Sequence, residues 1–277
     1  MIDCTEIFLE IIEFIAETGL FLLIGGFAGF SSGMLGIGGG VIFVPALYFL
    51  LPLVGVAEAV IPSTAIATSL FSGSFSAASS AYNHIISKNC EIKKAFFLAS
   101  GSVISATIIP RLVVTLNPDI LKTVLVIVLF FVAIKLLTSN HNNEAVYVLK
   151  DIYLIVVGLI VGTLSAFCGM GGGVILVPAL IYFTNIGMKK SVGTSALVVA
   201  ITMSTATINY AMLSIDKTGL SESIIKYSVG IPFAFGAFWG ARIGVKYVNK
   251  FSTSTLKKIF SVFLLFMIFS MVYKIYF

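Results

Sequence analysis

Charged residues are scarce in this sequence, and their scarcity decides which class of protein it encodes. Only 10% of the 277 residues are Asp, Glu, Lys or Arg, whereas roughly 25% is usual for soluble domains. Hydrophobic residues make up 58% of the chain, and the mean hydropathy is +1.09. This composition excludes an ordinary soluble domain and indicates a membrane protein. The net charge of +5 is no sign of nucleic-acid binding, because Lys and Arg lie in short segments between apolar runs, where they act as orientation signals.

Cysteine is also rare. Cys4, Cys90 and Cys168 are far apart and odd in number, which argues against a disulfide framework and against a metal cluster. The first 18 residues contain acidic side chains but no Lys or Arg, so they lack the basic region that begins a cleaved signal peptide. We interpret residues 1–18 as an amphipathic lead-in that stays on the protein.

Residues for catalysis are missing as well. No nucleophile stands with a base and no group of metal ligands is visible, so we expect neither an enzyme nor a bound metal or cofactor. The Gly-x-x-x-x-Gly-Lys-Ser/Thr motif of nucleotide hydrolysis is absent. Carboxylates inside the apolar runs are nearly absent, and proton relays in membranes normally use acidic or His side chains. The sequence therefore leaves a uniporter, a channel-like carrier and symport through backbone carbonyls all open.

Long apolar runs account for most of the chain. They predict an all-α polytopic membrane protein with about eight to ten membrane segments, several of them long enough to cross a hydrocarbon core of about 30 Å. The runs fall at about 20–34, 40–52, 59–83, 95–114, 119–138, 152–167, 173–184, 191–213, 224–247 and 255–276.

A glycine-rich segment occurs twice. The thirteen residues 36–48, GIGGGVIFVPALY, return 133 positions later as GMGGGVILVPALI at 169–181, with ten identities. Residues 20–52 would form a helix of about 50 Å if they were continuous, too long for one comfortable crossing. We therefore expect each motif to break a helix into tilted spans or half-helices.

The repeat divides the chain into two homologous halves. We assign 19–138 to the first transmembrane repeat, the polar stretch 139–150 to a linker and 151–277 to the second repeat. Three further pairings support the duplication: Ala67-Thr68-Ser69-Leu70 with Gly193-Thr194-Ser195-Ala196, Asn83 with Asn209, and Arg111 with Arg242.

Loop charges bear on the orientation of the halves. If all ten segments cross, most lysines collect on one side, near 88–94, 150, 189–190 and 246–250, which favours inverted repeats with both termini outside. If each broken segment counts once, eight crossings remain, the halves are parallel and the bias nearly vanishes. We favour the inverted arrangement.

Glycine at the breaks has a physical role. In hydrocarbon an unpaired N–H or C=O costs several kcal/mol, so a broken helix is tolerated only where it lines a wet cavity or is buried in protein. Pro45 and Pro178 lie in the segments that follow and each frees a carbonyl upstream. If those segments are helical, their N-terminal amides attract an anion at the break. The alternative is that the glycines only permit tight helix crossing.

The paired Gly-x-Gly-Gly-Gly-x-x-x-Val-Pro motifs, each followed by a Gly-Thr-Ser-like element, resemble the sulfite exporter TauE/SafE family, also called the 4-toluenesulfonate uptake permease family. The resemblance spans about residues 25–273. It implies a multi-pass inner or plasma membrane protein that moves small sulfur-containing anions such as sulfite, thiosulfate, sulfoacetate or other sulfonates. Two places depart from the family pattern: Ala67 stands where Gly is common, and Ile85, Ile86 and Ser87 stand where relatives often carry arginines.

Candidate substrate-binding residues follow from the breaks, the hydroxyls and the paired asparagines. They are Gly36, Gly38, Gly39, Gly40, Pro45, Thr68, Ser69 and Asn83 in the first half, and Gly169, Gly171, Gly172, Gly173, Pro178, Thr194, Ser195 and Asn209 in the second. The hydroxyls can donate to sulfur oxyanions or bond neighbouring helices, and the asparagines can bind substrate or cap a helix. We give the two roles equal weight for Thr194 and Ser195, and favour helix bonding in the first half and capping for the asparagines.

Four further residues have two readings each. Cys168 can contact a sulfur substrate or act as a small hydrophobe, and His84 can carry a proton or sit at the membrane interface. Arg111 and Arg242 can attract anions at the two mouths or snorkel to headgroups. For each of these four residues we favour the second role.

We predict a secondary transporter of small sulfur-containing anions working by alternating access. The alternatives are a membrane structural or assembly subunit and a transporter of an unrelated small anion. The expected partners are the anion and the lipid bilayer, with no nucleic acid, and the sequence leaves the oligomeric state open.

Overall fold

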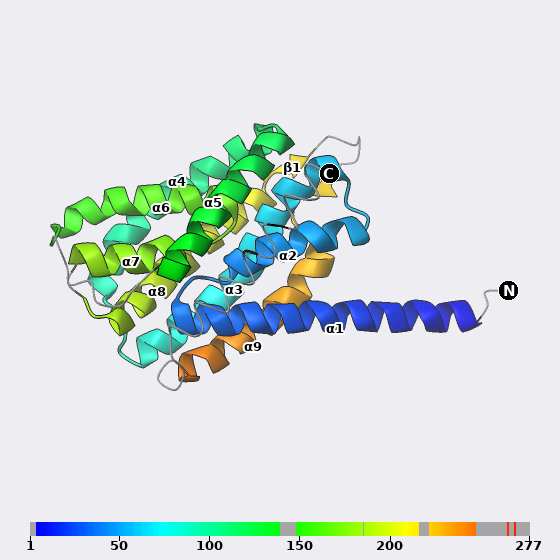
Figure 1. Ribbon diagram of the computed structural model, residues 1–277, viewed down its shortest axis with the longest axis horizontal. Helices are drawn as coiled ribbons and strands as arrows, with labels where there is room; N and C mark the ends of the chain where they lie inside the picture. Colours follow the sequence, from blue (N-terminus) through cyan, green and yellow to red (C-terminus); the bar gives the residue numbers. More distant parts are fainter. Residues whose placement is uncertain are drawn as a thin grey trace.

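The structure, a computed structural model, describes residues 4–138, 148–184, 186–215 and 222–247, together with the single residues 265 and 269. Within these ranges the regular secondary structure is helical (Figure 1), apart from one short antiparallel pair in which Ser214 faces Ser223. The all-α membrane fold that the sequence predicts is confirmed, whereas the small strand pair was not expected. The elements are α1 (Cys4–Leu35), α2 (Gly40–Leu53), η1 (Glu58–Val60), α3 (Ile61–Ile86), α4 (Ile92–Thr115), α5 (Pro118–Thr138), η2 (Asp151–Tyr153), α6 (Leu154–Cys168), α7 (Gly173–Thr184), α8 (Met188–Ala211), β1 (Ser214–Ile215), β2 (Glu222–Ser223) and α9 (Tyr227–Tyr247).

Helix length follows from the apolar runs and from the two breaks. Five described segments are long and apolar enough to cross a membrane: Ile15–Leu35, Ile92–Thr115, Asp151–Cys168, Met188–Ala211 and Tyr227–Tyr247. The two helices that follow the glycine motifs, α2 and α7, have 14 and 12 residues, or about 21 and 18 Å, which is too short for a crossing of about 30 Å. They are half-helices.

The first helix is continuous from Cys4 to Leu35. The expected lead-in and the first apolar run therefore belong to one helix, whose N-terminal part extends away from the other helices in Figure 1. Of the expected linker, residues 139–147 lie outside the described part of the chain, and the N–H of Leu149 donates to the carbonyl of Phe183 at 2.9 Å.

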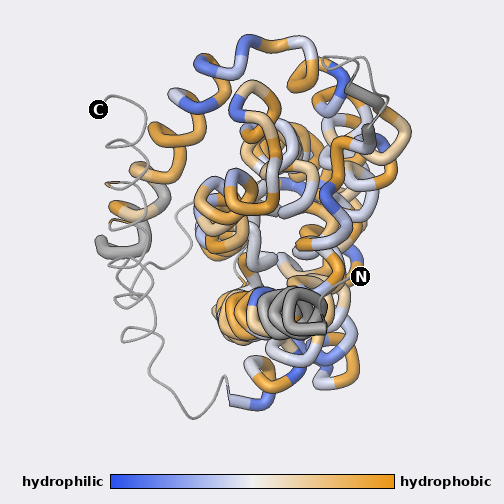
Figure 2. Tube along the Cα trace, turned by 90° about the vertical axis from the view of Figure 1, so that its right-hand side faces the viewer, coloured by the Kyte–Doolittle hydropathy of each residue, from blue (hydrophilic) through white to orange (hydrophobic). Residues whose placement is uncertain are grey.

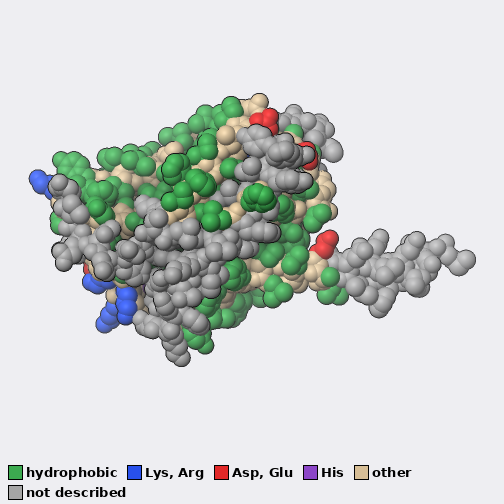
Figure 3. All heavy atoms as spheres, viewed as in Figure 1, with side chains coloured by type: hydrophobic (Ala, Val, Ile, Leu, Met, Phe, Trp, Pro, Cys, Tyr) green, Lys and Arg blue, Asp and Glu red, His purple; other side chains and the backbone are tan. Residues whose placement is uncertain are grey.

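The outer surface is apolar. Large side chains such as those of Leu23, Phe131 and Phe235 are 62–74% exposed, and hydrophobic residues predominate along the helices in Figure 2 and over the visible described face in Figure 3. Exposure of this extent would be costly in water. It suits a surface that faces lipid tails.

Each half packs its first helix against the fourth helix of the other half. Parallel helices α1 and α9 touch where Gly25 meets Phe233 and Gly29 meets Ala237. Parallel helices α6 and α4 touch in the same way, through the pairs Gly158–Leu98 and Gly162–Ser102. Glycine lets the two backbones approach where any side chain would collide, as is common between membrane helices.

Between these pairs, α3 and α8 run antiparallel. Gly73 lies beside Met203 near the middle, and His84 lies beside Gly193 near one end. The two helices carry the paired Thr-Ser elements, 126 positions apart. Equivalent helices therefore run in opposite directions at the centre of the molecule.

The contacts give a different pairing for the arginines than the sequence suggested. Leu98 and Phe233, which occupy equivalent places, are 135 positions apart, as are Ser102 and Ala237. By this register Arg111 is equivalent to Lys246 rather than to Arg242, which lies 131 positions on. The two pairings differ by four residues, about one helical turn. A sequence comparison across loops of unequal length does not determine the register that closely.

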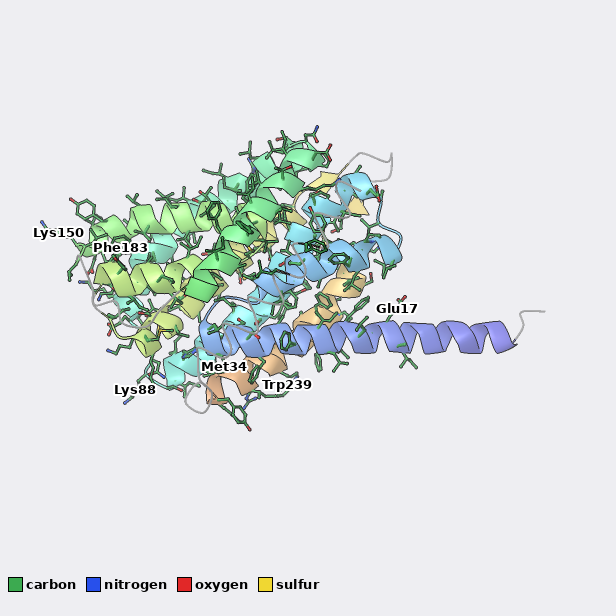
Figure 4. All side chains as sticks on the ribbon, viewed as in Figure 1. Glu17, Met34, Lys88, Lys150, Phe183 and Trp239 are labelled. Atoms are coloured by element: carbon green, nitrogen blue, oxygen red, sulfur yellow. The ribbon has the colours of Figure 1, made fainter. Side chains whose placement is uncertain are left out.

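Basic residues gather at one end of the molecule. Lys93 pairs with Asp151 at 2.7 Å, Lys190 pairs with Glu91, and Lys94 Nζ donates to the carbonyl of Thr184 at 2.9 Å. These contacts bring together the start of α4, η2, the end of α7 and the start of α8, and Lys88 and Lys150 lie at this end in Figure 4, opposite Glu17. In Figure 3 the visible basic side chains lie at this end, and most of the visible acidic side chains lie toward the opposite end.

Candidate substrate site at the two helix breaks

The two glycine motifs adopt the same backbone conformation. In each motif three glycines have positive φ, and equivalent angles differ by 5° or less: 67° and 71° at Gly36 and Gly169, 82° and 77° at Gly38 and Gly171, and 74° and 72° at Gly39 and Gly172. Residues with a side chain rarely adopt this conformation. The breaks at 36–39 and 169–172 are therefore set by local sequence.

The breaks also touch one another. A side-chain carbon at Gly40 would collide with the carbonyl oxygen of Gly169 and approach the Cα of Met170 within 2.8 Å. Equally, one at Gly173 would collide with the carbonyl oxygen of Gly36 and approach the Cα of Ile37 within 2.6 Å. Such reciprocal contacts are expected when two segments are related by a two-fold axis. We call this contact between residues 36–40 and 169–173 the junction.

Both half-helices begin at the junction. The N–H groups of Ile42 and Phe43 donate to the carbonyl of Gly39 at 3.0 and 3.2 Å, and those of Ile175 and Leu176 donate to Gly172 in the same way. The amides before them have no partner within their own helix, and Gly39 supplies no side-chain cap to α2. Two helix N-termini thus place their partial positive charge at one point.

Two serines bind the break of the opposite half. Ser69 Oγ of α3 donates to the carbonyl of Gly169 at 2.8 Å, and Ser195 Oγ of α8 donates to the carbonyl of Gly36 at 3.0 Å. Both serines are fully buried. The sequence favoured bonding within or between helices for the first half, and the structure gives both serines the same bond to the facing break.

The neighbouring threonines point away from the junction. Thr68 Oγ1 accepts the N–H of Lys226 at 3.0 Å, and Thr194 Oγ1 accepts the N–H of Glu91 at 2.9 Å. These amides lie immediately before α9 and α4. Each threonine therefore holds the start of a helix from the other half, and only the serine of each Thr-Ser pair reaches a break.

At the start of α4 this contact is reinforced. Lys190, one turn before Thr194 on α8, forms an ion pair with the Glu91 side chain. The hydrogen bond from Lys190 lowers the pKa of the Glu91 carboxyl from its usual value, and burial raises the pKa of the adjacent Cys90 thiol. One segment of α8 thus binds both the backbone and the side chain of Glu91.

The centre of the junction is filled by two residues that the sequence did not single out. Val199 and Met203 of α8 are fully buried, and both would meet a side-chain carbon at Gly38 or Gly171. At the register of the Thr-Ser pairs, α3 has Gly73 and Ala77 at these positions. This difference in side-chain size makes an otherwise two-fold junction asymmetric. A comparison of the two helix sequences at that register would have revealed it.

Space beside the junction is apolar. A small pocket with a volume of about 10 Å³ lies where the two half-helices begin. Its walls are Val41, Val128, Leu164, Met170, Gly172, Val174 and Ile175. Pro45 and Pro178 lie one turn further along α2 and α7, where each removes a backbone donor and frees a carbonyl four residues upstream.

The paired asparagines lie outside the junction. Asn83 Nδ2 donates to the carbonyl of Ser79 at 2.7 Å, and Asn209 Nδ2 donates to the carbonyl of Thr205 at 2.9 Å. Each binds its own helix one turn back, so neither forms the helix cap that the sequence favoured.

The remaining candidates are spread over the molecule. Cys168 is buried at the end of α6, directly before the second break. Arg111 and Arg242 are exposed on α4 and α9, and the Arg242 guanidinium lies 5.7 Å from the centre of the Trp239 ring. His84, in the last turn of α3, is 1% exposed and so is enclosed by protein atoms. Among the described residues no three His, Cys, Asp or Glu side chains are grouped as metal ligands.

Comparison with known proteins gives a consistent result. The model of the family described as sulfite exporter TauE/SafE matches residues 21–271. A probable membrane transporter protein of Haemophilus influenzae is 30% identical over 258 residues, covering 89% of this chain and 94% of that protein. Probable membrane transporter proteins of Methanocaldococcus jannaschii (26%; 88% of this chain, 91% of that protein) and Bacillus subtilis (YunE, 24%; 89% and 94%) are also similar. No solved structure matches the chain.

The matched region covers both breaks, both Thr-Ser pairs and the whole of α2 to α9. The chain therefore belongs to the sulfite exporter TauE/SafE family, a family of membrane transporters.

Proposed function

We propose that this protein is a secondary transporter that carries small sulfur-containing anions across the inner (cell) membrane by alternating access. The observation that supports it most is the junction, where two half-helices begin against one another. Broken helices whose N-termini face a central site are the means by which secondary transporters bind anionic groups.

The chemistry of the junction favours an anion. No carboxylate belongs to its described residues, and a cation would need one or a ring of free carbonyls. Instead the site offers backbone amides and, when the serine bonds to Gly36 and Gly169 open, two hydroxyl donors. The restriction to sulfur oxyanions such as sulfite, thiosulfate and sulfonates rests on the family.

Alternating access fits the arrangement of the halves. The antiparallel crossing of α3 and α8 and the reciprocal contacts of the breaks are those expected of inverted repeats. In our proposal the serine bonds and the threonine contacts are exchanged as one half rocks against the other. The lysine-rich end then faces the cytoplasm, as the positive-inside rule requires.

Flux of labelled sulfite or thiosulfate into liposomes that contain the purified protein tests the proposal. We expect uptake above that of empty liposomes, slowed by excess unlabelled sulfite, thiosulfate or a simple sulfonate and much less by sodium-matched chloride. Uptake of a cation or a neutral solute in place of these anions would contradict the substrate class. Absence of any flux would favour the structural or assembly role, and flux of an anion without sulfur would favour the other alternative.

A further inference from the structure

One face of α3 carries a row of buried polar side chains. Ser76, Ser80 and His84 are spaced four residues apart, so they lie on one side of the helix, and they are 0%, 0% and 1% exposed. Ser76 Oγ, Ser80 Oγ and His84 Nδ1 have no hydrogen-bond partner within the described part of the chain. Ser32 Oγ of α1, also fully buried, has none either. We call Ser32, Ser76, Ser80 and His84 the polar row.

The polar row leads from the first break to the lysine-rich end. Ser76 Oγ lies 3.6 Å from the position that a side-chain carbon on Gly39 would take. At the other end, His84 Nε2 is 3.3 Å from the carbonyl of Gly33, the residue that follows Ser32. Two residues beyond the end of α3 is Lys88, which Figure 4 shows at the basic end of the molecule.

The second half has the same architecture without the row. Tyr210 OH donates to the carbonyl of Ala166 at 3.0 Å, where His84 approaches Gly33 in the first half. Thr202, equivalent to Ser76, bonds to Ser102 at 2.7 Å and to Val198, and Ala206, equivalent to Ser80, has no polar side-chain atom. Of the four equivalent residues, Ser165 alone keeps an unpartnered hydroxyl among the described atoms.

Unpartnered polar groups inside a protein are rare because each loses its bonds to water, and bound water is the usual explanation. A water molecule needs two to four polar partners, which a row spaced by single helical turns provides. The members of the row are 0–1% exposed, so the row is closed in this structure. We propose that the polar row lines a water-filled access path to the first break when the protein opens toward the lysine-rich end, and that the second half lines no equivalent path. The path gives the anion of the proposed function its route to the junction from that side.

Cysteine labelling tests this path separately from transport. In a variant with Cys4, Cys90 and Cys168 replaced, single cysteines are introduced by Ser80→Cys and, as the matched control, Ala206→Cys. A membrane-impermeant charged methanethiosulfonate is then added to sealed vesicles of either orientation. We expect position 80 to react about tenfold or more faster than position 206, and only from the lysine-rich side, because a thiol reacts as the thiolate and needs access to water.

Equal rates at the two positions, or no reaction at position 80, would overturn the proposal. Ser76→Cys replaces Ser80→Cys if the latter variant accumulates poorly. Replacing His84 by Tyr copies the second half and should slow labelling at position 80 at least severalfold. Labelling needs no substrate, so the two proposals can fail separately. If position 80 reacts but the protein carries no sulfur anion, the proposed function is refuted and the path stands. If the protein carries sulfur anions but position 80 does not react, only the path is refuted.

Discussion

The hydroxyl of Ser69 donates a hydrogen bond of 2.8 Å to the carbonyl of Gly169, one hundred residues away in the other half of the chain. Ser195 and Gly36 form the equivalent bond. Each half therefore satisfies a carbonyl that the other half frees when its helix ends, and the two breaks support one another.

Removing either serine hydroxyl should weaken the fold. In Ser69→Ala or Ser195→Ala a buried carbonyl loses its donor, which costs about 1–3 kcal/mol. We expect both variants to unfold at a lower temperature in detergent, by similar amounts. Ser100→Ala is the control, because Ser100 is only partly buried and bonds to the carbonyl of Phe96 in its own helix, and it should leave the midpoint nearly unchanged. A loss in only one half would contradict the equivalence of the two bonds.

A larger side chain in place of a glycine at either break should abolish transport. Val at Gly39 or Gly172 must adopt a positive φ and would also press on Phe43 or Val161, respectively, at a backbone cost of roughly 1–3 kcal/mol. We expect membrane-inserted protein with no anion flux. Gly19→Val controls for the added side chain, since nothing lies within 4 Å of that position. Normal flux in both break variants would remove the glycines from the mechanism.

The orientation of the chain can be tested at two lysines. Lys93 and Lys190, which directly follows position 189, form ion pairs at the basic end, which should face the cytoplasm. Single cysteines introduced at positions 93 and 189 should be labelled from the same, cytoplasmic side of intact cells or oriented vesicles. Labelling from opposite sides would refute the inverted arrangement of the two halves.

Met203 should control both the stability and the size selectivity of the junction. Met203→Ala copies Ala77 and empties buried space beside Gly38 and Gly171, which typically costs about 2–5 kcal/mol. We expect a lower unfolding temperature and, in flux competition, weaker discrimination against larger sulfonates. Met212→Ala is the control because Met212 is 78% exposed. Unchanged competition by large sulfonates in Met203→Ala would show that the thioether does not border the substrate.

The ion pair of Glu91 with Lys190 should make stability depend on pH in acid. Because the folded protein lowers the pKa of Glu91, the pair stabilises above the carboxyl's ordinary pKa of about 4.5 and loses this effect as the pH falls through the lowered value. The pair is partly exposed, so Glu91→Gln should cost only about 0.2–1 kcal/mol at neutral pH. Unfolding temperatures of the two proteins should converge in acid, and a constant difference down to low pH would contradict the assignment.

The sequence by itself determined the membrane environment, the helical class and the position of both breaks. Composition decides the first two, because only helices and closed barrels satisfy the backbone in lipid. The breaks are local as well: three glycines per motif adopt a backbone conformation that other residues rarely take. The duplication was visible for the same reason, since both copies obey the same local constraint.

Only the tertiary structure decided what surrounds the breaks. Thr68 and Ser69 are adjacent in the chain, yet one holds the start of α9 and the other a facing break, because successive side chains on a helix point about 100° apart. The asymmetry at Met203 and the burial of His84 depend on helices distant in sequence coming together. Residue spacing fixes what a segment can form, but the neighbours of a side chain are set by how those segments pack.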